Sequence, residues 1–199
     1  MLCHLNYTID KSHYRKYFFD NYDKGDWHRK GDKVLKIWWK MFNIDEVVKS
    51  ITYDLGIENL NIKPRFSYQL PNTNLMSHID KDRIVGINFN LLEEEPEIIV
   101  DGKTFKYENA LIDVGSKVHS VIAKDNPRLV LKYAIRNKWQ DIYNILDKKG
   151  LIDHAKTYLI NPNYELYESK IIETDKQFVR WVIKFLKYIH TTLIEINLK

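Results

Sequence analysis

Cysteine, glycine and proline are scarce in this sequence, and each scarcity excludes a class of protein. A single cysteine, Cys3, among 199 residues rules out an internal disulfide and favours a reducing, cytoplasmic location. Seven glycines and five prolines, with no low-complexity tract, exclude a collagen-like or largely disordered chain. Residues 1–10 lack a basic start followed by an apolar run, so we expect no secretory signal.

Charge of one sign is not concentrated anywhere along the chain. The net charge is +4, from 31 basic and 27 acidic residues. Residues 1–60 carry 10 basic and 9 acidic side chains, residues 61–137 carry 11 and 10, and residues 138–199 carry 10 and 8. Because a nucleic-acid-binding domain usually has a clustered basic patch, this distribution disfavours a nucleic-acid partner.

The composition predicts one globular domain over residues 1–199. Hydrophobic residues make up 44% of the chain and aromatic residues 13%, which is enough to bury a core. The periodicity divides it into an N-terminal helical and aromatic region (1–59), a β core (60–136) and a C-terminal helical extension (137–199).

The N-terminal region is expected to be mainly helical. We predict a short helix over residues 11–20 and a second one that Asn43 caps and Gly56 ends. Residues 33–42 fit a helix or a strand equally well, and the Trp38-Trp39 pair within them fits core packing better than a substrate platform.

From Ile62 onward apolar residues recur with a period of two, which indicates strands. In the strand over residues 84–92, Gly86, Asn88 and Asn90 share one face, which predicts a polar cavity on that side and packing on helices on the other. Asp101-Gly102 marks a hairpin turn. About eight antiparallel strands fit a jelly roll, the two-sheet architecture of cupins; they are 63–70, 75–80, 84–92, 97–100, 103–107, 110–114, 118–123 and 128–135.

Three residues in this β core carry the spacing of a metal site. His78 and Asp80 lie two positions apart, so on a strand both face the same side. His119 comes from a strand that the fold must bring alongside. Two histidines and one carboxylate that leave open positions are typical of non-haem iron(II) oxygenases.

His78-x-Asp80, the distal His119 and Arg128 nine residues later resemble the iron(II)/2-oxoglutarate-dependent oxygenases over residues 60–136. The resemblance implies a double-stranded β-helix fold, iron(II) bound by His78, Asp80 and His119, and 2-oxoglutarate as cosubstrate. It also implies that Arg128 pairs with the distal carboxylate of 2-oxoglutarate. Halogenating relatives lack the metal-binding carboxylate, so Asp80 favours hydroxylation, of a peptidyl or small-molecule substrate.

The sequence departs from this family pattern in two places. Val130 stands where many members have Ser or Thr, so a second contact to the carboxylate must come from elsewhere, and Tyr68 is the candidate. Ala134 stands where the enzymes that repair alkylated bases have a second arginine, which disfavours base repair. Arg83 could hold the cosubstrate or a substrate carboxylate, or be a surface arginine, and Asn88 is a further candidate on the cavity wall.

The strands 118–123 and 128–135 are predicted to form a hairpin. In that register His119 opposes Lys132, and Arg128 faces the same side as His119. Lys132 then also points inward, where a buried unpaired charge is costly; it needs an acidic partner or a bound anion, unless a bulge breaks the register.

The C-terminal extension is expected to hold two helices. One covers residues 139–150, and a long one begins at Thr174 or Asp175. Charges on the long helix exclude a transmembrane span. It could pack on the outer face of the sheet, lie on a membrane surface or form a homodimer.

Two other functions remain open on the sequence. A non-catalytic jelly-roll binding module would carry His78, Asp80 and His119 as incidental polar residues. A cupin-type metalloenzyme that does not use 2-oxoglutarate would bind a metal and give Arg128 no role.

Overall fold

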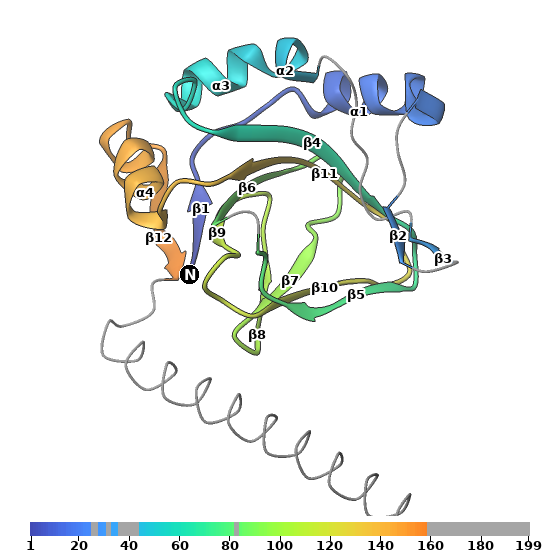
Figure 1. Cartoon of the computed structure of the whole chain (residues 1–199). Helices are drawn as coiled ribbons and strands as arrows, with labels where there is room; N and C mark the ends of the chain where they lie inside the picture. Colours follow the sequence, from blue (N-terminus) through green and yellow to red (C-terminus); the bar gives the residue numbers. More distant parts are fainter. Residues whose placement is uncertain (25–27, 31–32, 36–43, 82–83, 159–199) are drawn as a thin grey trace, which may run out of the picture. The chain divides into compact units, whose positions relative to one another are not determined.

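The fold is built around two antiparallel β-sheets that face one another, with helices on the outer side of the larger sheet (Figure 1), and two further strands form a separate hairpin. The computed structural model describes residues 1–24, 28–30, 33–35, 44–81 and 84–158, which belong to one compact unit. The expectation that a single domain extends to residue 199 remains a prediction. The strands are β1 (Leu2–Leu5), β2 (His28–Lys30), β3 (Lys33–Leu35), β4 (Ile62–Gln69), β5 (Thr73–His78), β6 (Val85–Asn90), β7 (Glu97–Val100), β8 (Lys103–Lys106), β9 (Asn109–Asp113), β10 (His119–Ala123), β11 (Arg128–Ile135) and β12 (Ile152–Tyr158). The helices are α1 (Lys11–Asp20), the short 3-10 turn η1 (Tyr22–Lys24), α2 (Ile44–Val47), α3 (Lys49–Leu55) and α4 (Trp139–Lys148).

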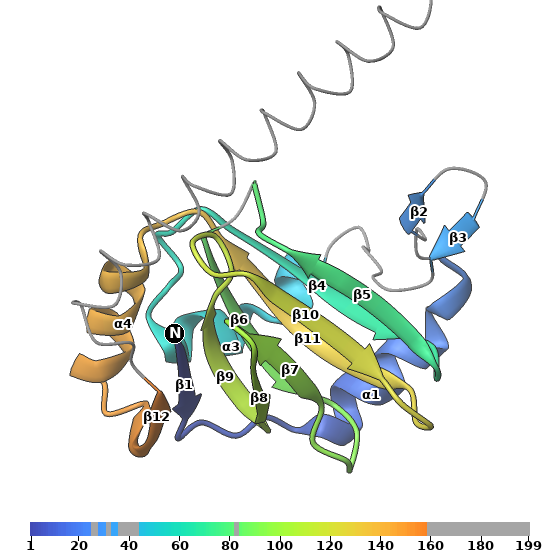
Figure 2. The same ribbon diagram turned by 90° about the horizontal axis from the view of Figure 1, so that it is seen from below.

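The larger sheet has six strands in the order β12-β1-β9-β6-β11-β4, and the smaller has four in the order β5-β10-β7-β8. Figure 2 shows the smaller sheet in front of the larger one. All eight strands predicted for the β core are present, with ends shifted by a few residues. The Asp-Gly turn is also confirmed, since Asp101 and Gly102 have φ of 49° and 76°, as a two-residue turn with positive φ at both positions requires.

Strands β1 and β12 were not predicted, although they extend the larger sheet at one edge. β1 pairs with β9 on one side and with β12 on the other. Four residues are too few to display a period of two, and β12 contains polar residues throughout its middle. These two strands form because a neighbouring edge is available for pairing, which the local sequence does not reveal.

Apolar side chains fill the space on both faces of the larger sheet. Its outer face packs against α1, α3 and α4. This confirms the prediction that the apolar face of the strand 84–92 packs on helices. A smaller group lies between the two sheets, including Val100, Ile112, Val121 and Val130. The polar cavity described below occupies the rest of this inner space.

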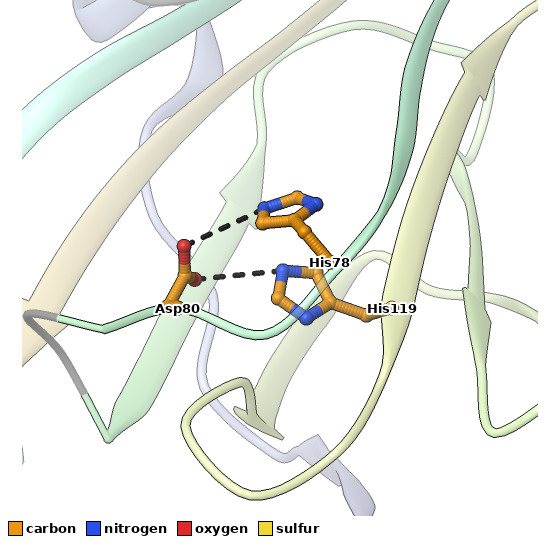
Figure 3. Close-up of side chains that lie close together, drawn as sticks. All are labelled: His78, Asp80 and His119. Carbon is orange, nitrogen blue, oxygen red and sulfur yellow. Dashed lines mark ion pairs between the residues drawn. The ribbon is translucent and has the colours of Figure 1, made fainter. Parts of the chain in front are cut away.

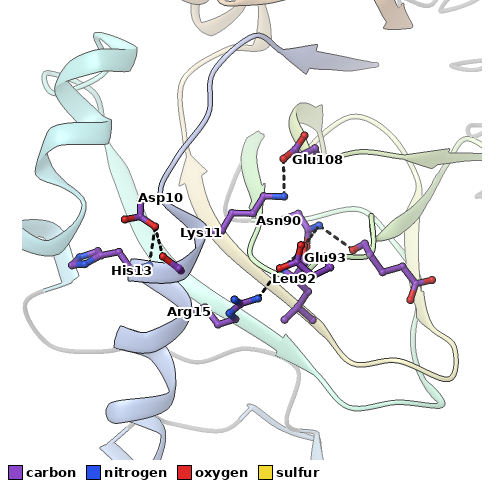
Figure 4. A network of polar contacts seen from close by, with 10 residues as sticks. Asp10, Lys11, His13, Arg15, Asn90, Leu92, Glu93 and Glu108 are labelled. Carbon is purple, nitrogen blue, oxygen red and sulfur yellow. Dashed lines mark hydrogen bonds and ion pairs between the residues drawn. The ribbon is translucent and has the colours of Figure 1, made fainter.

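Helix α1 is held to the β core by the buried rings of Tyr14 and Phe18 and by the surface ion pairs drawn in Figure 4. Asp10 caps the helix by accepting a hydrogen bond of 3.1 Å from the His13 backbone N–H. Lys11 pairs with Glu108 at 2.6 Å and Arg15 with Glu93 at 3.1 Å. Exposed pairs of this kind contribute little, up to about 1 kcal/mol each, so the buried rings of the helix provide most of its attachment.

The predicted hairpin of residues 118–123 with 128–135 is wrong. β10 pairs with β5 and β7 in the smaller sheet, whereas β11 pairs with β4 and β6 in the larger one. Residues 124–127 therefore cross from one sheet to the other. A four-residue turn can join two paired strands of one sheet or connect strands of two different sheets. The long pairing of β11 with β4 places β11 in the larger sheet.

Some of the predictions fall outside the described residues: the cap at Asn43, the Trp38-Trp39 pair, Arg83 and the long helix from residue 174 with its proposed dimer. The helix predicted to end at Gly56 is present as α2 and α3, and Gly56 has the left-handed φ of 70°. Among the described residues, no helix is long and apolar enough to cross a bilayer.

Cys3 should be chemically inert in the folded protein. Its side chain is fully buried in β1, and burial raises the pKa of the thiol to about 11. At about pH 8 roughly one thiol in a thousand is then ionised, and the thiolate is the reactive form. We expect iodoacetamide to label native protein far more slowly than protein in denaturant, as measured by mass spectrometry. Equal labelling rates would contradict the burial of this residue.

Candidate metal centre

Three side chains that could bind one metal ion converge where β5 ends and β10 begins (Figure 3). His78 is the last residue of β5, His119 is the first residue of β10, and the two are paired across the strands. Asp80 lies two residues beyond β5, where its backbone N–H donates to the Val114 carbonyl at 2.9 Å. One donor atom from each of the three lies within 4.8 Å of the other two.

A β-bulge turns His78 toward the interior. Leu75 and His78 both line the central cavity, although they are three residues apart and a regular strand would place them on opposite faces. The pairing of β5 with β10 shifts between these positions, so that Met76 and Ser77 together oppose Ser120. Bulges often orient side chains next to active sites. Strand alternation alone, as used in the sequence analysis, did not include this bulge.

The backbone fixes the proton on each imidazole. Nδ1 of His78 lies 2.7 Å from the Met76 carbonyl, and Nδ1 of His119 lies 3.2 Å from the Lys117 carbonyl. Because a carbonyl oxygen accepts hydrogen bonds and cannot donate them, each Nδ1 carries the proton. In the neutral rings Nε2 then has the lone pair. Such support from a carbonyl is usual for histidines that bind metals.

These unprotonated nitrogens both face the Asp80 carboxylate. The Nε2 atoms of His78 and His119 lie 3.5 and 3.4 Å from the two oxygens of Asp80. The Nε2 of His119 is buried without a hydrogen-bond partner, and its side chain is 2% exposed, against 32% for His78. Three electron-pair donors around one point call for a cation, and the donor set of two imidazoles and one carboxylate suits ferrous iron.

Arg128 is buried and lines the same cavity as His119, in keeping with the expectation that the two face the same side. The cavity has a volume of about 540 Å³ and is lined by the three metal-site residues, by Arg128 and by Asn88, among others. The guanidinium of Arg128 donates through Nη2 to the hydroxyl of Tyr107, which also accepts a 3.1 Å hydrogen bond from Nδ2 of Asn88. Arg128 Nε and Asn88 Oδ1 are buried without hydrogen-bond partners, so both have capacity left for a ligand.

Tyr107, and not Tyr68, is the tyrosine that lies beside Arg128. The Tyr68 side chain packs against Phe18, Phe19 and Tyr22 on the outer face of the larger sheet, so the proposed contact of Tyr68 with the cosubstrate is wrong. The cause is strand parity: Tyr68 pairs with Leu129, the neighbour of Arg128, and so points the opposite way. Tyr107 follows a short hairpin, and no local pattern marked it.

Asn90 does not line this cavity, contrary to the expectation for its strand face. Its amide Nδ2 donates to the Leu92 and Glu94 carbonyls at 2.8 and 2.9 Å and thereby holds the loop after β6 (Figure 4). Asn88 fulfils the expectation, because it is 3% exposed and faces the cavity. Arg83 lies outside the described residues. Lys132 lines the cavity, so its predicted inward orientation is confirmed.

Comparison with known proteins identifies the fold. No protein-family model matches the sequence, and no curated protein matches it. A prolyl hydroxylase from Trichoplax adhaerens, solved with a hypoxia inducible factor peptide, superimposes with a TM-score of 0.51 at 10% identity, over 73% of this chain and 86% of that one. A Pseudomonas putida prolyl-4-hydroxylase matches with a TM-score of 0.46 at 15% identity, over 64% and 84% of the two chains.

The chain therefore has a double-stranded β-helix fold like that of the Trichoplax adhaerens prolyl hydroxylase, as the sequence resemblance implied. A third structure, a 2-oxoglutarate-iron(II) oxygenase family protein from Burkholderia pseudomallei, matches with a TM-score of 0.38 at 14% identity, over 51% and 64% of the chains. At these identities the likeness concerns architecture, and chemistry must be argued from the site itself.

Proposed function

We propose that this protein is an iron(II)- and 2-oxoglutarate-dependent dioxygenase that hydroxylates a small-molecule or peptidyl substrate. The observation that carries the proposal is the joint lining of one cavity by His78, Asp80, His119 and the buried Arg128. A metal site alone would suit many reactions. A buried arginine in the same cavity adds a site for the carboxylate of a cosubstrate.

The residues divide the work between the metal and the cosubstrate. His78, Asp80 and His119 would hold the ferrous ion, and their total charge of −1 leaves the centre cationic and able to attract a dianion. Iron and 2-oxoglutarate together, when bound, supply the redox chemistry that activates dioxygen. Arg128 would pair with the distal carboxylate, and the Tyr107 hydroxyl, which accepts from Arg128, would keep the guanidinium in place.

The burial of these residues supports a defined direction of approach. His119 and Arg128 are closed off from solvent, at 3% and 7% exposure, whereas His78 and Asp80 are partly exposed. The cosubstrate would therefore occupy the inner part of the cavity and the substrate would reach the metal from the side of His78. Exclusion of water around Arg128 strengthens its attraction for a carboxylate.

The two alternative functions are less well supported. A binding module gives no reason for two imidazole lone pairs to face a carboxylate within 3.5 Å. A cupin-type enzyme without 2-oxoglutarate gives no reason for a buried arginine whose Nε has no hydrogen-bond partner. Burial of such a group without its full set of partners is costly, which favours a cavity that is completed by an anion.

Anaerobic titration tests the proposal. We expect the full-length protein with iron(II) and 2-oxoglutarate to develop the weak visible charge-transfer band of the chelate, and aerobic incubation to yield succinate. The band requires both additions, so each alone is the control. Iron binding that never produces the band would favour the cupin-type enzyme, and the absence of iron binding would favour the binding module.

A further inference from the structure

The cavity is lined by far more positive than negative charge. Among its described lining residues Asp80 is the one carboxylate, and six are cationic: Lys63, Arg65, Lys81, Arg128, Lys132 and Arg136. The chain as a whole is almost balanced in charge, so this concentration comes from the fold. The proposed function uses Arg128 for the cosubstrate and assigns no role to the other five.

Strand pairing places these cations in an ordered row. Lys132 of β11 lies opposite Arg65 of β4, and two positions further along Ala134 lies opposite Lys63. Lys132 lies four positions along the strand from Arg128, which corresponds to about 13 Å at the rise of a β-strand. The row is therefore a second cationic site, distinct from the one that would hold the cosubstrate.

Exposure increases along the row from the interior to the opening. Arg128 is buried, Arg65 and Lys132 are half-buried, and Lys63, Lys81 and Arg136 are exposed. A cleft lined by charges of one sign draws in ligands of the opposite sign and raises their rate of association.

We propose that Arg65 and Lys132, with Lys63 and Arg136 at the opening, bind an anionic group of a small-molecule substrate, a carboxylate or a phosphate. All four residues line one cavity of about 540 Å³, a space that suits a small anion better than an extended polyanion. The described lining residues include no aromatic ring other than the imidazoles of His78 and His119. Single-stranded nucleic acids normally bind by stacking on such rings, so a small acid fits the site better.

The site can be tested by calorimetric titration of the full-length, metal-free protein at low salt with pyrophosphate and with tricarballylate. We expect binding that weakens as salt is raised and falls by about tenfold or more in Arg65→Gln/Lys132→Gln, because each loses a charge-assisted contact. The matched control, Arg15→Gln/Lys16→Gln on α1, removes one arginine and one lysine outside the cavity and should bind like the unaltered protein. Tighter binding of pyrophosphate indicates a phosphorylated substrate, and tighter binding of tricarballylate indicates a carboxylated one.

Several results would overturn the inference. One is that neither anion binds. A second is that the Arg65→Gln/Lys132→Gln variant binds the anions as tightly as the Arg15→Gln/Lys16→Gln control. A third is that only a polyanion binds, with a ten-nucleotide oligothymidylate and hexaglutamate as the probes. If the Arg65/Lys132 variant does not fold, Lys63→Gln/Arg136→Gln at the exposed opening replaces it, with an expected loss of about threefold or more; unchanged affinity there counts equally against the site.

The inference rests on the proposed function only for the reaction that the bound molecule undergoes. The Arg65→Gln/Lys132→Gln variant should still form the charge-transfer band at saturating iron(II) and 2-oxoglutarate, because the three metal-site residues and Arg128 are unchanged in it. Anion binding without the band in the unaltered protein would refute the oxygenase and leave the anion site. A charge-transfer band without anion binding would refute the anion site and leave the oxygenase.

Discussion

Replacing His119 with alanine is expected to abolish iron binding and the charge-transfer band. His119 contributes a buried Nε2 that has no hydrogen-bond partner and lies 3.4 Å from Asp80. Loss of a residue that merely supports a ligand costs about 10–100-fold in metal affinity, so loss of a ligand should cost more than about 100-fold. Equilibrium dialysis with iron(II) under anaerobic conditions measures this directly.

The control for His119→Ala is His13→Ala, because His13 is an exposed histidine on α1 outside the site. It should bind iron like the unaltered protein. His119 is buried, so alanine could also disturb packing; His78→Ala, at a more exposed ligand, should show the same loss with little change in thermal unfolding. Iron affinity that survives both substitutions would remove the metal centre from consideration.

Replacing Arg128 with glutamine should weaken 2-oxoglutarate binding and leave iron binding intact. The guanidinium is buried, and its Nε has no partner among the described residues. Removing one member of a buried charged pair costs about 2–5 kcal/mol, which corresponds to at least about 30-fold in affinity. The concentration of 2-oxoglutarate that gives half of the charge-transfer band reports this loss.

Tyr107→Phe distinguishes direct from indirect effects at this site. It removes the hydroxyl that accepts from Arg128 and Asn88 but keeps the ring and the charge of Arg128. The loss of one such hydrogen bond is worth about 0.5–1.5 kcal/mol, so the affinity for 2-oxoglutarate should fall by about tenfold or less. An Arg128→Gln variant that binds 2-oxoglutarate normally would contradict the assignment and favour a cupin-type enzyme.

The wrong hairpin shows how a correct inference about a site can follow from a wrong pairing. The sequence predicted that β10 and β11 pair and that His119 and Arg128 therefore face the same side. The two strands lie in different sheets, yet both residues line the cavity because each points inward from its own sheet. Alternation along a strand survives a change of partner, since it is a property of the backbone.

Local sequence determined the eight core strands and the residue types of the candidate site. The period of two, the turn at Asp101-Gly102 and the order of His78, Asp80, His119 and Arg128 lie within short stretches of chain, and short-range backbone geometry dictates their consequences.

Tertiary structure alone decided which strands pair. Strand pairing produced the bulge that turns His78 inward and the cationic row along β4 and β11. It also placed Tyr107 against Arg128 and turned Tyr68 outward. Each of these depends on contacts between residues distant in sequence. The free energy of such a contact depends on which residues pack and pair across strands, and the residues adjacent in sequence do not specify these partners.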